Sequence, residues 1–213
     1  MQGPDAQYPV VFEAERPERF QRRHVLLRIA MVLVLSLMLA FSWFVVLVYL
    51  AVPVVAAAFV SRDKGRYLEQ SGELMRRFSH WLVAFDAYIT YLTDRLPLED
   101  PEDVVRYEVR MGGAPTPGSA LLRLVYSIPH GLVLLVLGFV IAPVTWVVAA
   151  VFILLTGNYP DALYRFHLGV VRWTARLLAY HASLTDEYPP FALSEEPRRP
   201  ETHLPPASAG KSV

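Results

Sequence analysis

The stretch that decides the fold reads LVYSIPHGLVLLVLGFVIAPVTWVVAAVFILLTGNY and spans residues 124–159. It contains no charged residue, and neither does the earlier stretch from Ile29 to Val60. A helix needs roughly 20 apolar residues to cross about 30 Å of hydrocarbon, and both stretches exceed that length. Together with 54% hydrophobic residues and a mean hydropathy of +0.33, they predict an integral membrane protein.

Each apolar block is too long for one comfortable crossing, since about 32 helical residues extend roughly 48 Å. Pro53 in the first block, and Pro129, Gly138 and Pro143 in the second, are natural break points. Each block therefore predicts a transmembrane helical hairpin, with a short or partly re-entrant second arm as an open alternative. Arginines flank both blocks, and four spans would place them all on one side. The positive-inside rule makes that side, with both termini, cytoplasmic.

The chain repeats one plan in two halves. Five residue pairs share an offset of 92 positions: Gly65/Gly157, Tyr67/Tyr159, Trp81/Trp173, Tyr88/Tyr180 and Asp94/Asp186. Five matches in one order on one offset indicate a duplicated unit. We therefore expect an all-α membrane fold of two tandem repeats, each a hairpin followed by an amphipathic interfacial helix. Short extended segments, Tyr8–Phe12 and Tyr107–Val109, precede the hairpins.

The predicted boundaries follow from this plan. The first repeat covers residues 1–94, with its hairpin at about 25–60 and its amphipathic helix at about 66–93. A polar linker at 95–104 leads to the second repeat at 105–193, with a hairpin at about 120–156 and a helix at about 160–184. Residues 194–213 form a proline-rich tail whose composition is typical of disorder.

The amphipathic helices supply the candidate contact residues. In the second helix, Phe166, Val170, Trp173 and Leu177 recur at the spacing of one helix face, with arginines on other faces. Such a helix either lies in the headgroup plane or covers the bundle, and the two are compatible. The candidate headgroup ligands are Arg76, Arg77, Arg165, Arg172 and Arg176, and the candidate interfacial anchors are Trp81, Trp173 and His130.

No complete catalytic constellation is visible. The chain has no cysteine and a formal net charge of zero, so thiolate chemistry is excluded and no bulk field recruits nucleic acid. His130 is the only histidine inside an apolar block, and a structural or interfacial role is favoured for it. The carboxylates at 99–103 lie in a proline-flanked linker that favours solvation over acid–base chemistry. We predict no catalytic residue, no cofactor and no metal.

The second half carries an ordered set of motifs. They are Leu122-Arg123-Leu124, Ser127-Ile128-Pro129-His130, Leu155-Thr156-Gly157-Asn158-Tyr159-Pro160, Val171-Arg172-Trp173, Arg176-Leu177-Leu178-Ala179-Tyr180 and Leu184-Thr185-Asp186-Glu187-Tyr188-Pro189-Pro190-Phe191. Over roughly 105–193 this set resembles a bacterial membrane domain family known only as domain of unknown function 4389 (DUF4389). The first half is similar to a diverged copy that lacks the Pro-His pair. The resemblance implies a multi-span protein of the bacterial inner membrane and brings no established activity.

These observations favour a non-enzymatic accessory or scaffold subunit of a larger membrane complex, with protein partners and membrane lipids as its contacts. A lipid-binding or lipid-handling role for the arginine-rich helices is the second hypothesis. A small channel or transporter is the third, although the blocks show no polar pore lining or ionisable relay. A membrane enzyme ranks last.

Overall fold

The computed structural model describes residues 10–14, 16–38, 43–98, 100–137 and 141–194. Its helices are α1 (Arg22–Met38), α2 (Trp43–Asp63), α3 (Tyr67–Gln70), α4 (Gly72–Ile89), α5 (Pro117–Tyr126), α6 (Ile128–Val136), α7 (Ala142–Thr156) and α8 (Asp161–His181). A 3₁₀ turn, η1, occupies Pro101–Asp103, and the strands are β1 (Val10–Glu13) and β2 (Arg106–Val109).

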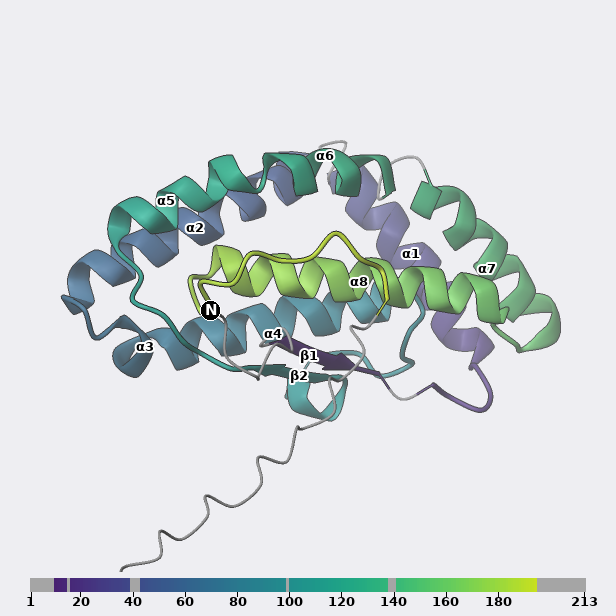
Figure 1. Cartoon of the computed structure of the whole chain (residues 1–213). Coiled ribbons are helices and arrows are strands. Elements are labelled where there is room, and N and C mark those ends of the chain that lie inside the picture. The colour runs from purple at the N-terminus through teal and green to yellow at the C-terminus, as the bar shows by residue number, and fades with distance from the viewer. Residues whose placement is uncertain (1–9, 15, 39–42, 99, 138–140, 195–213) are drawn as a thin grey trace, which may run out of the picture.

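The helices form an arch over a central pair (Figure 1). Helices α1, α2, α5, α6 and α7 make the arch, and α4 and α8 lie side by side beneath it. The two halves interlock, because α2 of the first half packs against α5 of the second and α1 packs against α7. The long central helices also differ in sequence from α1, α2 and α7 of the arch, since each central helix has one apolar and one polar face.

The two short strands join the halves under the central pair. They are antiparallel, with Val10 opposite Val109 and Phe12 opposite Tyr107. The predicted extended segments therefore pair with each other. Phe12 and Tyr107 are both buried, so this small sheet adds its inner face to the core beneath α4 and α8.

Local sequence explains where several helices begin and end. Thr116 and Ser119 form a capping box at the start of α5, with Pro117 in the first turn. Helices α4 and α8 end alike: Tyr91 and Ser183 adopt a left-handed conformation, and the next residue in each case donates to the carbonyl five positions back. This is the Schellman motif, in which a residue other than glycine is uncommon at the left-handed position.

The predicted transmembrane hairpins are wrong. Among the helices that the structure describes, none is long and apolar enough to cross a membrane. The second apolar block contributes to α5, α6 and α7, of 10, 9 and 15 residues; α5 ends before Ser127, and residues 138–140 between α6 and α7 lie outside the described residues. Helix α1 has 17 residues, and α2 contains Pro53 and ends in Arg62 and Asp63. Within the described residues, the two uncharged stretches therefore do not form continuous membrane-spanning helices.

The same finding overturns the predicted multi-pass location in the bacterial inner membrane with both termini cytoplasmic, which depended on four spans. Of the predicted break points, Pro129 and Pro143 lie in the first turns of α6 and α7, and Pro53 lies inside α2. Gly138 and the tail from residue 195 lie outside the described residues.

Candidate functional site: an apolar cap above paired arginine clasps

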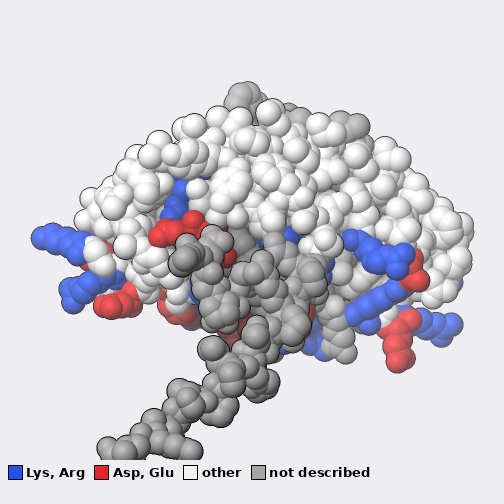
Figure 2. Space-filling view, in the orientation of Figure 1, with Lys and Arg blue, Asp and Glu red and all other residues white. Residues whose placement is uncertain are grey.

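The outer surface of the arch is apolar. Figure 2 shows an uncharged dome over α5, α6, α2 and α7. We define the cap as ten exposed aliphatic side chains of the arch helices: Leu33, Leu50, Val54, Val125, Ile128, Leu132, Val136, Val144, Val147 and Leu155. Leu132, Val144 and Leu155 are 63%, 65% and 74% exposed. Single exposed apolar residues are ordinary, but a continuous apolar surface over several helices marks an interaction site.

Charged side chains gather along the lower edge of the molecule, which we call the rim (Figure 2). Arg62 and Lys64 lie at and just after the end of α2, and Arg22 and Arg23 begin α1. Arg16 forms an ion pair with Asp161 at the start of α8. Charge and apolar surface are thus segregated to opposite sides of the fold.

A buried arginine beneath the arch holds the first half together. The Arg28 side chain, on α1, is fully buried and donates to the Thr93 carbonyl and, at 3.0 Å, to Asp94 Oδ1. Its guanidinium lies 4.6 Å from the ring centroid of Tyr88. The other Asp94 oxygen accepts the backbone N–H of Gln21. Burial lowers the pKa of Arg28, and the Asp94 carboxylate opposes that shift. We call these five residues the first clasp.

The second half builds the same arrangement. Arg123, on α5, is 3% exposed and donates to the carbonyl of Thr185 and to Asp186 Oδ1. Its guanidinium lies 4.5 Å from the Tyr180 ring centroid, and Nη1 also donates to the Tyr180 carbonyl at 2.9 Å. The second oxygen of Asp186 accepts the backbone N–H of Ala114. These residues form the second clasp. Like the first, it joins a buried arginine to a backbone carbonyl, a carboxylate and a tyrosine ring.

Two tyrosine side chains, one from each half, donate hydrogen bonds to backbone carbonyls of the other half. The Tyr67 hydroxyl donates to the Ala182 carbonyl at 2.5 Å, and the Tyr159 hydroxyl donates to the Thr90 carbonyl at 3.2 Å. Donors and acceptors are both 92 positions apart. Each bond runs from the turn before one central helix to the end of the other. Burial raises the pKa of both tyrosines, so both stay neutral donors.

The chain after α8 turns back along the outer face of that helix. We call residues 187–194 the strap. Arg176 donates to the carbonyls of Ala192 and Ser194, and the Phe191 ring stacks on His130 with centroids 3.9 Å apart. A Cβ on Gly169 would lie 2.8 Å from Leu193, so glycine is needed for this close approach. The strap covers one side of α8.

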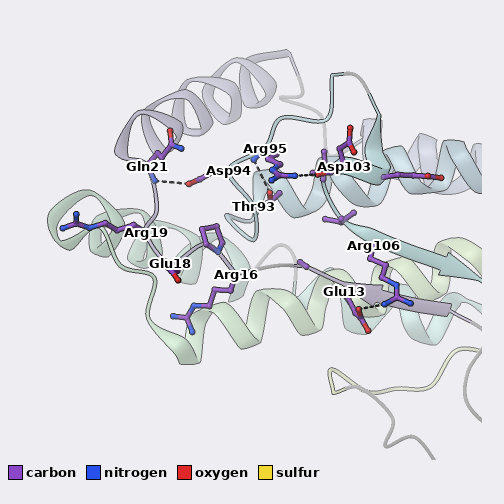
Figure 3. A pocket seen from close by; sticks show the side chains of 15 residues that line it. Glu13, Arg16, Glu18, Arg19, Gln21, Thr93, Asp94, Arg95, Asp103 and Arg106 are labelled. Atoms are coloured by element: carbon purple, nitrogen blue, oxygen red, sulfur yellow. Dashed lines mark hydrogen bonds and ion pairs between the residues drawn. The ribbon is translucent and has the colours of Figure 1, made fainter.

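A polar pocket lies on the underside, between the N-terminal segment, the first clasp and residues 102–106 (Figure 3). Its cavity is about 860 Å³ and four arginines line it. Arg106 pairs with Glu13 and Glu108, Arg95 donates to the Asp103 carbonyl, and Arg16 pairs with Asp161. The arginines do not converge on one point (Figure 3), so the pocket offers no focused anion site.

The structure separates the predicted headgroup arginines into two groups. Arg77 and Arg165 are exposed on α4 and α8. Arg76 pairs with Glu73 and Glu102, while Arg172 and Arg176 donate to strap carbonyls. The side chains of Arg76, Arg172 and Arg176 are therefore already bonded to groups of the protein itself. The sequence pattern places all five on polar helix faces, but it does not show that Glu102 and the strap fold back onto three of them.

The predicted anchors also differ. Trp81 is 42% exposed and donates to the Pro97 carbonyl. Trp173 is buried and its indole N–H donates to Nδ1 of His130, which is fully buried. Because Nδ1 accepts this bond, neutral His130 carries its proton on Nε2. Burial lowers the pKa of His130. Trp173 and His130 thus lie in the core, and only Trp81 is placed to reach a surface partner.

The clasps are what sequence reasoning missed. Leu-Leu-Arg at 26–28 and 121–123, and Leu-Thr-Asp at 92–94 and 184–186, were visible as repeat markers. A basic residue and an acidic residue that recur together in both copies were the available signal for an ion pair. Among the described residues, no group of histidine and acidic side chains could hold a metal ion.

The comparisons with known proteins bear on the second half. Comparison with curated proteins and with solved structures gave no match. A family model described as Domain of unknown function (DUF4389) matches residues 117–192, which run from the start of α5 to the strap. Residues 117–192 of this chain are therefore a DUF4389 domain.

Proposed function

We propose that this chain is a non-enzymatic lipid-binding protein whose cap enters the acyl-chain region of a lipid layer. The rim then lies among the headgroups. The observation that supports this proposal is the segregation of an uncharged aliphatic cap from a charged rim (Figure 2). A lipid surface has the same two-zone chemistry, with apolar chains below a polar layer.

The composition of the cap favours lipid over a protein partner. Protein interfaces are enriched in aromatic residues and arginine, which supply most of their binding energy. Apart from Tyr126 and Phe152, which are 55% and 47% exposed, the large exposed apolar side chains of α5, α6 and α7 are all leucine, valine or isoleucine. Between Leu124 and Thr156 no residue is charged, so this part of the arch offers no ion pair to a partner. Aliphatic side chains without polar partners suit a fluid hydrocarbon environment.

The energy available from the cap is large enough to hold the protein at a lipid surface. Full burial of a leucine or valine side chain stabilises by about 1.5–3 kcal/mol. The cap residues are roughly half exposed, so ten of them contribute on the order of 10 kcal/mol. Arg77 and Arg165, exposed on the central helices, would add contacts to anionic headgroups.

Vesicle flotation tests the proposal. The protein is mixed with phosphatidylcholine vesicles, and the fraction that floats is compared between variants. Leu132→Asn with Val144→Asn changes two cap residues, and Leu98→Asn with Met111→Asn changes two exposed apolar residues outside the arch helices. We expect the first pair to lower the partition coefficient at least 30-fold and the control pair to lower it less than 3-fold. Equal binding by all three proteins would contradict the proposal.

A second comparison separates headgroup contacts from cap insertion. Replacing Arg77 and Arg165 with glutamine is expected to lower binding to phosphatidylglycerol vesicles while leaving phosphatidylcholine binding intact. The hypothesis of an accessory subunit stays a prediction and is compatible with lipid binding, because the cap and the central helices present different surfaces. The channel or transporter alternative also stays a prediction, without a specific observation in its favour.

A further inference from the structure

Side chains of the strap form the cover over His130. The His130 side chain is fully buried, and the Phe191 ring stacks on it with the two ring planes 10° apart. Phe191 is itself 52% exposed, so the ring that covers the histidine also meets solvent. Tyr188 lies beside His130, with ring centroids 4.8 Å apart, and is 44% exposed. The burial of His130 therefore depends on a thin segment at the surface.

The strap is held mainly by hydrogen bonds that lie near solvent. It follows α8 without forming a helix or strand of its own (Figure 1). Its carbonyls accept hydrogen bonds from Arg172 and Arg176, and the Tyr188 hydroxyl donates to the exposed carbonyl of Tyr126. Water can replace each of these bonds when the strap moves away, so they add only modestly to its stability.

The closed strap fits His130 only in its neutral form. Nδ1 accepts the indole N–H of Trp173 at 2.9 Å, and an indole can only donate. Protonation would place a hydrogen on both ring nitrogens, so Nδ1–H would oppose the Trp173 N–H. Nε2 has no hydrogen-bond partner among the described residues. A charged His130 would thus find no acceptor under the closed strap, whereas water would supply acceptors once the strap had moved.

The neighbouring charges do not favour a proton on His130 either. Helix α6, which carries His130, packs against α5 and α8. On α8, His181 lies near enough for the two histidine charges to repel, and on α5 Arg123 is paired with Asp186. Burial lowers the pKa of His130. The other charged or titratable side chains around the strap, none of which bonds to His130 within the described structure, are Tyr126, Arg172, Arg176, Tyr180, Glu187 and Tyr188.

We propose that the strap is an acid-released cover of α8, and that protonation of His130 opens it while the helices stay folded. The closed strap holds His130 neutral, so it binds fewer protons than the open strap, and acid favours opening. An exposed histidine has a pKa of about 6.5, so closure is complete above that pH and weakens below it. Opening uncovers Trp173 beside the cap residues Ile128 and Leu132, which enlarges the exposed apolar surface.

The reactivity of a cysteine in the strap measures opening, because the natural chain contains no cysteine. Ala192 is half-buried in the strap and is replaced by Ala192→Cys in the full chain. Ala58, exposed on α2, is replaced in a second protein by Ala58→Cys, which reports the effect of pH on the reagent alone. Both proteins react with a pyridyl disulfide, and the ratio of the two rates is followed against pH. Circular dichroism at each pH reports the helices.

We expect this ratio to rise at least about fivefold between roughly pH 7 and pH 5, with no loss of helical signal. His130→Asn should abolish the rise, because its side chain does not titrate and its oxygen can still accept the Trp173 N–H. Trp173→Phe removes the donor that opposes protonated His130. The rise should therefore begin at a higher pH in that variant, which a merely structural role for the pair would not produce.

Three results would overturn the proposal. A ratio that is independent of pH, or that rises equally in His130→Asn, would show that His130 does not control the strap. A rise that disappears in His181→Gln but persists in His130→Asn would assign the response to His181. Loss of the helical signal in step with the rise would mean that acid unfolds the helices instead of releasing the strap.

Discussion

The two halves of the molecule share one frame and differ in what covers it. Both place a buried arginine under the arch, bind it with a carbonyl and a carboxylate after the central helix, and stack it on a tyrosine. The strap then covers the outer face of α8, whereas Leu74, Phe78 and Trp81 on α4 stay 59%, 45% and 42% exposed. The two halves thus share their internal contacts and differ at the surface.

The largest expected effect comes from removing either clasp arginine. Arg28→Met and Arg123→Met each leave a carboxylate without its cation, which for a buried pair costs about 3–5 kcal/mol. The Asp94 side chain is 11% exposed and the Asp186 side chain 51%. Arg28→Met should therefore destabilise more, because water can still solvate Asp186. The free energy of unfolding from urea titrations measures both. A larger loss for Arg123→Met would contradict this order and the role given to solvation of Asp186.

Acid should destabilise the fold in part through His181 in the second half. Burial, Arg123 and His130 lower the pKa of His181 to about 4, and its ring bonds Ser127 at 2.6 Å. A lowered pKa means that the folded state binds fewer protons, so stability is complete above about pH 6.5 and falls as the pH drops toward 4. The largest loss of unfolding free energy that protonation of this one histidine can cause is about 3 kcal/mol. The corresponding position in the first half is Ile89. His181→Gln should flatten the stability profile between pH 6.5 and 4, and an unchanged slope would contradict this assignment.

A glycine beside the second clasp gives a smaller, local test. Gly113 has a φ of +102°, and a Cβ there would lie 2.0 Å from Asp186 Oδ2. Gly113→Ala should cost about 2 kcal/mol, since it strains the backbone and displaces the carboxylate from Arg123. Gly112→Ala is the matched control, because a Cβ at Gly112 would meet open space, with no contact within 4 Å. Thermal unfolding that shifts equally for both variants would exclude steric conflict at Asp186.

The exchanged tyrosine bonds give the smallest expected effect. Tyr67→Phe removes one hydrogen bond to Ala182 and should cost about 1 kcal/mol. Tyr159→Phe removes the bond to Thr90 and also the contact between its hydroxyl and His167, so a cost of about 2 kcal/mol is expected. Chemical denaturation resolves this difference. Identical losses would mean that His167 does not depend on the Tyr159 hydroxyl.

Much of the internal plan could be predicted from sequence. The offset of 92 was visible in Tyr67/Tyr159 and Asp94/Asp186, and these residues make matching contacts in the structure. Periodic apolar residues likewise mark the ranges in which α4 and α8 lie. Such signals are readable because buried, contact-making positions constrain residue type in both copies.

The hydrophobic blocks and the candidate site could not be predicted in the same way. An uncharged run does not show where helices break, and Ser127-Ile128-Pro129 ends one helix and starts another within the second block. Trp173 and His130 looked like surface anchors because the strap that buries them comes later in the chain. The cap itself depends on which side of each arch helix faces outward, and α2 and α7 are too uniformly apolar to show it.

The most direct test of lipid binding by the cap is a depth measurement with single cysteines. Leu132→Cys on the cap and Glu108→Cys on β2 are each labelled with an environment-sensitive fluorophore, and phosphatidylcholine vesicles are added. The proposal predicts a blue shift at position 132, with loss of quenching by aqueous iodide and gain of quenching by lipids carrying spin labels on their acyl chains. Position 108 should keep its emission and its iodide quenching. Equal aqueous quenching at both positions in the presence of vesicles would contradict the proposal.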